Sequence, residues 1–74
     1  MTHYTVNYEG LDDVAKHNKA IVDTKDYLGE DRFDKLTGLF REQPYTLDQF
    51  CLAASFAGVQ GYPAKAWFNY CYPL

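Results

Sequence analysis

Two cysteines and two histidines have the most versatile side-chain chemistry in this chain. Cys51, Cys71, His3 and His17 form neither the CxxC nor the HxxxH spacing of a zinc site. If two C-terminal helices fold back on each other, Cys51 comes level with about residue 70. The pattern favours two buried, reduced thiols, with a disulfide, or zinc held with a histidine, as alternatives. We therefore expect no metal and no other cofactor.

Three acidic residues come closest to a catalytic pattern. Glu30, Asp31 and Asp34 could supply a general acid and a general base. Their spacing is more typical of a solvated, negatively charged face. Neither histidine has a serine or cysteine beside it in the sequence, and there is no glycine-rich phosphate-binding motif. The sequence therefore predicts a protein that is not an enzyme.

The aromatic residues gather in the C-terminal part of the chain. Residues 44–74 hold eight of the thirteen aromatics but only two charged side chains, Asp48 and Lys65. This part should supply most of the core, and residues 1–43 most of the solvated surface.

Seven tyrosines are more than a small core can use. They either cap the core with their hydroxyls in water or contact another protein, since tyrosine and tryptophan are enriched at interface hot spots. On the second interpretation, aromatic and acidic side chains together contact the partner. The candidate partner-binding residues are Tyr27, Glu30, Asp31, Asp34, Tyr62, Trp67, Tyr70 and Tyr72.

A β-strand is predicted at residues 2–8, with Tyr4, Val6 and Tyr8 on one side. A single strand leaves its backbone groups unpaired. Either residues 20–22 form a partner strand in place of helix, or the strand pairs with a second copy of the chain. In the second case Tyr4, Val6 and Tyr8 are the dimerisation residues.

The rest of the chain predicts helices at residues 11–22, 31–43, 46–57 and 62–71, with a polar connector at residues 23–30. The first helix should bury Leu11, Val14, Ala15, Ile21 and Val22, and turn Ala20 mostly outward. The third has few polar residues and should be central. Thr46 and Gln49 match a capping box, and Gly58 is placed to end that helix in a left-handed conformation.

These elements define the expected fold. Seventy-four residues make a single small domain, residues 1–74. The fold class is α+β and mostly helical, with one N-terminal strand followed by three or four packed helices.

Residues 46–71 also match the spacing of a helix-turn-helix motif. That motif needs a small residue, a turn glycine and three buried positions, which here are Ala54, Gly58, Val59, Ala64 and Trp67. Any tight helical hairpin needs the same residues. The second helix offers Lys65 and Asn69 but no arginine, so it is poorly equipped to contact bases and phosphates.

Charge narrows the choice of partner. The net charge is −3 and the isoelectric point about 5.1, which disfavours direct binding to nucleic acid or an anionic membrane and leaves basic protein surfaces. No apolar run approaches membrane-spanning length, and residues 2–9 are polar and alternating, unlike a signal peptide. We expect a cytoplasmic protein with reduced thiols.

In size, acidity and aromatic content, and in having no catalytic motif, the chain resembles the small phage-encoded anti-defence inhibitors, anti-CRISPR proteins among them. The resemblance implies a protein-binding inhibitor that occludes a basic or nucleic-acid-binding surface, for example in a nucleic-acid-processing complex of a bacterial host cytoplasm. Two alternatives are a DNA-binding regulator that uses residues 46–71 and a homo-oligomeric structural module.

Overall fold

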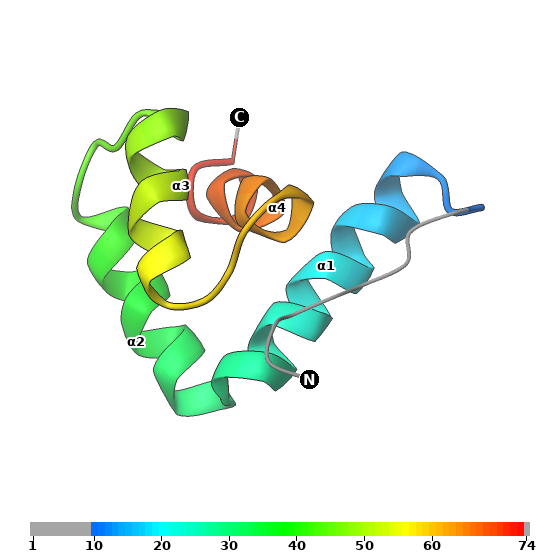
Figure 1. The fold of residues 1–74 in the computed structure, drawn as a ribbon, viewed down its shortest axis with the longest axis horizontal. Helices are drawn as coiled ribbons and strands as arrows, with labels where there is room; N and C mark the ends of the chain where they lie inside the picture. The colour runs from blue at the N-terminus through cyan, green and yellow to red at the C-terminus, as the bar shows by residue number, and fades with distance from the viewer. Residues whose placement is uncertain (1–9, 74) are drawn as a thin grey trace.

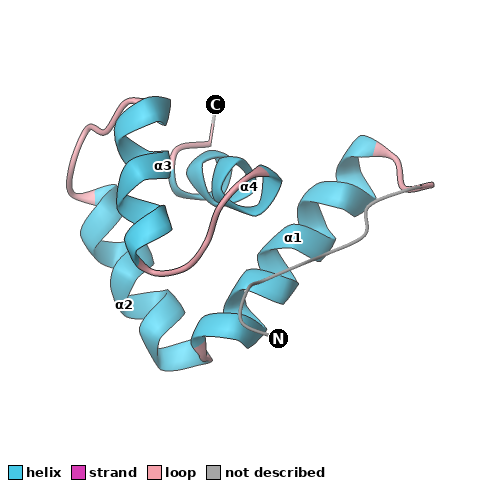
Figure 2. Cartoon of the chain, viewed as in Figure 1, coloured by secondary structure: helices cyan, strands magenta, loops and turns pink. Residues whose placement is uncertain are grey.

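The computed structural model describes residues 10–73, which form four helices (Figure 1). These are α1 (Asp13–Leu28), α2 (Glu30–Arg41), α3 (Leu47–Phe56) and α4 (Tyr62–Cys71). The mostly helical fold is therefore confirmed, and residues 10–73 contain no strand (Figure 2). The predicted strand at residues 2–8, with Tyr4, Val6 and Tyr8, lies outside the described residues.

Helix α1 is longer than the sequence analysis predicted. Asp12 caps its N-terminus by accepting a 2.8 Å hydrogen bond from the Ala15 amide. The helix then continues through most of the predicted connector to Leu28, which is buried. Thr24 can be buried there because its hydroxyl donates to the Ala20 carbonyl oxygen at 2.7 Å. The prediction of a polar connector at residues 23–30 was wrong, because residues 23–28 continue α1 and the local bond satisfies the one polar side chain that is fully buried there.

The buried face of α1 also differs from the prediction. Ala20 and Ile21 are buried within the helix, so residues 20–22 are not a strand. Val14 and Val22, predicted to be buried, are 71% and 55% exposed, whereas Ala20, predicted to face outward, is fully buried. The true buried stripe runs through residues 20, 24 and 28, the i, i+4 and i+8 positions of a helix face, with residue 21 beside it.

A single residue, Gly29, joins α1 to α2. Its φ of 90° is accessible to glycine at little cost, and it lets the chain change direction between two helices without a loop. Helix α2 ends at Arg41 with Glu42 as its C-cap, which agrees with the limit that Pro44 sets.

Helix α4 is the central helix, and the prediction that α3 would be central was wrong. Helix α4 lies between α3 and α1 and also contacts α2 (Figure 1). It buries Pro63, Ala64, Ala66, Trp67 and Cys71. Its small residues let neighbouring helices approach closely. Helix α3 buries only Phe50 and Ala54, because neighbours cover one side of it.

The core is an aromatic cluster around Trp67. This indole stacks on Phe33 at 5.5 Å between ring centroids and meets Phe40 and Phe50 edge-on at 5.1 and 5.6 Å. Its Nε1 donates to the Thr37 hydroxyl at 2.9 Å, so its polar atom is satisfied inside the core. Phe50 and Ala54 are fully buried, as predicted.

Candidate protein-interaction site

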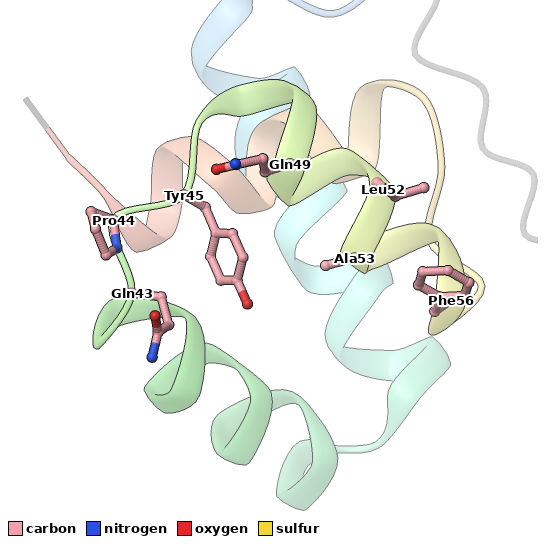
Figure 3. A pocket seen from close by; sticks show the side chains of 7 residues that line it. All are labelled: Gln43, Pro44, Tyr45, Gln49, Leu52, Ala53 and Phe56. Carbon is pink, nitrogen blue, oxygen red and sulfur yellow. The ribbon is translucent and has the colours of Figure 1, made fainter.

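A surface groove of about 530 Å³ lies between α3 and the loop that connects α2 to it (Figure 3). Most of its lining side chains are apolar. We call it the α3 groove, and its lining residues are Gln43, Pro44, Tyr45, Gln49, Leu52, Ala53 and Phe56.

Four residues of α3 form one wall of the groove. Gln49, Leu52, Ala53 and Phe56 are spaced i, i+3, i+4 and i+7, which places them on one side of the helix. We call them the outer stripe. Leu52 is 63% exposed and Phe56 84% exposed. Helix α3 is therefore apolar on two sides, one in the core and one in solvent, and contiguous exposed apolar side chains are typical of interaction surfaces.

The groove is built on fixed local geometry. The Thr46 amide donates to the Gln49 Oε1 at 3.0 Å, and the Gln49 amide donates to the Thr46 hydroxyl at 3.2 Å. This is the predicted capping box. Tyr45 forms the opposite wall, with its ring edge-on to Phe40 at 5.6 Å and to Phe50 at 6.5 Å. The groove thus has one wall on a capped helix and another on the core.

Tyr72 holds the α2–α3 loop in place. Its hydroxyl lies against the carbonyl oxygens of Phe40 and Gln43 and can donate its single hydrogen to one of them at a time. Its ring contacts Phe50 and Phe68 at 6.2 and 5.1 Å between centroids. Desolvation raises the pKa of the Tyr72 phenol, which keeps it protonated and able to donate.

The charges beside the groove are acidic. Helix α3 has one formal charge, Asp48, and no lysine or arginine. Glu42 precedes the lining residue Gln43, and both acids are exposed. Arg41 is also close in sequence, but its guanidinium carbon lies 5.3 Å from the centre of the Tyr70 ring, and its Nη2 donates to the Tyr70 carbonyl oxygen at 3.2 Å.

The predicted acidic residues lie at the other end of α2. Glu30, Asp31 and Asp34 are exposed near its start, close to the 45% exposed Tyr27 at the end of α1. We call these four residues the acidic corner. About 18 Å of helix separates Glu30 from the end of α2, where the α3 groove begins. Tyr27 also packs on the α3–α4 turn, since a Cβ added at Gly58 would lie 2.5 Å from its hydroxyl oxygen.

The other predicted aromatic contacts face the protein itself. Trp67 is fully buried, so the prediction that it is a partner contact is corrected: it is the centre of the core. Tyr62 and Tyr70 are half-buried, and the Lys16 Nζ lies 5.3 Å from the centre of the Tyr62 ring. Tyr62, Tyr70 and Tyr72 are thus all half-buried, unlike the exposed residues of the acidic corner.

Sequence analysis missed Leu52 and Phe56. Both were placed in a helix expected to be buried on nearly every side. One signal could have identified them. The apolar residues of α3 lie all around the helix, and they are more than a single covered face can bury.

The helix-turn-helix spacing corresponds to a real helical hairpin. Gly58 has a φ of 90°, and Ala54, Val59, Ala64 and Trp67 are all fully buried. Among the residues of α4, all of which the structure describes, only Lys65 and Asn69 are exposed.

The two cysteines differ in burial, Cys51 being half-buried and Cys71 buried. Cys51 and Cys71 are both free thiols. Burial raises the pKa of the Cys71 thiol to about 11, so it is protonated at neutral pH. Within residues 10–73 no three histidine, cysteine, aspartate or glutamate side chains are grouped to hold a metal ion. None of the described helices is long and apolar enough to cross a bilayer.

Comparisons of the chain with protein-family models, with curated proteins and with solved structures gave no match.

Proposed function

We propose that this protein binds another protein through the α3 groove. The observation that supports this function best is the exposure of Leu52 and Phe56, 63% and 84%, next to a groove of about 530 Å³. Because α3 is already a capped helix anchored in the core, its backbone loses little conformational entropy on binding, and an aromatic anchor in a complementary pocket is a typical hot spot.

We further propose that binding inhibits the partner by occluding a basic or nucleic-acid-binding surface, in a bacterial cytoplasm. The net charge of −3, the acid side chains Asp48 and Glu42 beside the groove, and the acidic corner support this choice. Acidic surfaces favour basic partners and speed their association.

Affinity capture from lysate of the source organism tests this function. The tagged wild-type protein and its Phe56→Ala variant are compared, with Val14→Ala as the matched control, because Val14 is 71% exposed on α1 and outside the groove. We expect Phe56→Ala to reduce recovery of the specific partner by about tenfold and Val14→Ala to leave it unchanged. Equal recovery with all three proteins would refute binding through the groove.

A helix-turn-helix regulator is the second candidate. The observation that favours it is the complete burial of Ala54, Val59, Ala64 and Trp67 around the left-handed Gly58. The narrow exposed face of α4 disfavours it, since a recognition helix needs several side chains in the major groove. A gel mobility-shift assay at low salt is expected to show no binding below micromolar concentrations. Tight binding that weakens with salt and is lost in Lys65→Ala would favour this function instead.

Self-association through an N-terminal strand at residues 2–8, with Tyr4, Val6 and Tyr8 at the dimer contact, stays a prediction. Light scattering on the intact chain and on a chain that lacks residues 2–8 tests it. A dimer that becomes a monomer on deletion would support the homo-oligomeric alternative, whereas a monomer in both cases would exclude it.

A further inference from the structure

We propose that the α3 groove accepts an amphipathic helix of the partner whose apolar face is flanked by lysine or arginine. This inference depends on the proposed function, because it specifies the kind of segment that the same groove would bind. It is carried by the shape of the groove and by the charges around it.

The shape fits a helix. The outer stripe extends over about 10 Å, or two helical turns, from Gln49 to Phe56. Pro44 and Tyr45 line the groove from the α2–α3 loop. A volume of about 530 Å³ can hold two or three large side chains, which is the number that a short helix presents at positions i, i+3 or i+4, and i+7.

The charges select a basic partner. Asp48, Leu52 and Phe56 follow one another at i, i+4 and i+8 along one ridge of α3, so a carboxylate stands at one end of the apolar stripe. Glu42 adds a second carboxylate where the opposite wall begins. At the other end, the last turn of α3 has no basic residue to offset the negative end of the helix dipole. Cations on a bound helix would thus be favoured at both ends.

The same charges argue against two other occupants. A second copy of the chain that paired through α3 would bring Asp48 and Glu42 of each copy toward an equally acidic surface, which opposes association. Nucleic acid would meet the same carboxylates. A basic amphipathic helix meets no such repulsion.

Fluorescence anisotropy with model peptides tests the proposal. The probe is a fluorescein-labelled peptide of about 18 residues, long enough to form a helix, with leucines on one face and lysines on the rest. One control has glutamate in place of every lysine. A second has the Leu/Lys composition in an order that gives no continuous apolar face.

We expect the amphipathic Leu/Lys helix to bind the full-length wild-type protein and both control peptides to bind far more weakly. The Kd should rise by about tenfold in Phe56→Ala and by about two- to fivefold in Asp48→Asn. The matched control Val14→Ala should change it by less than about twofold. Phe56 is 84% exposed, so its replacement leaves the fold intact.

Three results would overturn the proposal. The Leu/Glu helix could bind as tightly as the Leu/Lys helix, Phe56→Ala could leave the Kd unchanged, or the protein could form a concentration-dependent dimer that Phe56→Ala abolishes. Loss of the captured cellular partner in Phe56→Ala, with no binding of any model helix, would refute this inference and leave the proposed function standing. Binding of the Leu/Lys helix in the groove, with capture unaffected by Phe56→Ala, would show that the groove accepts a basic helix, but it would refute the proposed function and with it the inference that such a helix belongs to the captured partner.

Discussion

Helices α3 and α4 have the same length, 10 residues, and both are rich in apolar side chains, yet they differ in how much of that apolar surface they bury. Helix α4 has neighbours on several sides and buries five residues, whereas α3 lies at the edge and buries two. Apolar composition therefore does not decide which helix becomes central. The position of a helix among its neighbours decides which helix is central. The apolar residues that α3 cannot bury are available to a partner.

Phe50→Ala should have the largest effect on this arrangement. Phe50 is fully buried on the inner side of α3, in ring contact with Phe40 and Trp67. Its loss leaves a cavity and should lower the free energy of unfolding by about 3–5 kcal/mol, most of the stability of a domain this small. Urea unfolding followed by circular dichroism measures the change. A loss below about 1 kcal/mol would mean that α3 is not anchored in the core.

Enlarging alanines on the two helices should distinguish them further. Ala66 on α4 is 1% exposed, whereas Ala53 on α3 is half-buried and lines the groove. Ala66→Leu should cost about 1–3 kcal/mol through overpacking, and Ala53→Leu should cost much less because its side chain can extend into the groove. Melting temperatures of the two variants provide the comparison. Equal destabilisation would contradict the difference in burial.

The two helices also begin differently. Thr46 caps α3 through its side chain, whereas α4 begins after Gly61 with no side-chain cap. Thr46→Ala should therefore lower the free energy of unfolding by about 1 kcal/mol, because the Gln49 amide loses the hydroxyl that accepts its hydrogen bond. Chemical denaturation gives the energy. An unchanged midpoint would mean that the start of α3 does not depend on its side-chain cap.

The thiol of α4 should make stability depend on alkaline pH. Burial raises the pKa of Cys71 from 9.0 to about 11. Below pH 9 the thiol is protonated in both states, so it has no effect. Between the two pKa values the Cys71 thiol loses its proton in the unfolded chain but keeps it in the folded one. The free energy of unfolding therefore falls as the pH rises from 9.0 toward about 11. Denaturation at about pH 8 and about pH 10.5 should show a larger loss in wild type than in Cys71→Ala, which retains Tyr72. Equal losses would exclude Cys71 as the cause.

Local signals predicted part of this structure. The capping box at Thr46, the left-handed Gly58 and helix α4 between Gly61 and Tyr72 were all confirmed, because nearby residues determine them. The extension of α1 to Leu28 was not predicted. Thr24 is polar, and its burial depends on a hydrogen bond to the Ala20 carbonyl oxygen that cannot be inferred from the residue type.

The site could be predicted less well than the fold. The exposure of Glu30, Asp31 and Asp34 was anticipated from their charge, but Trp67 was taken for a partner contact, and Phe56 was not singled out at all. Both belong to apolar helices, and sequence alone does not say which neighbours will cover each side. Only the tertiary arrangement, with α4 between α1 and α3, reveals which aromatic is exposed.

The central claim is that Phe56 lies outside the core and that its side of α3 is free for a partner. Urea unfolding of Phe56→Ala, beside the chemically identical change Phe50→Ala on the same helix, tests it most directly. Because Phe56 is 84% exposed and Phe50 fully buried, Phe56→Ala should shift the free energy of unfolding by no more than about 0.5 kcal/mol. A loss above about 2 kcal/mol, approaching that of Phe50→Ala, would place Phe56 in the core and contradict the account.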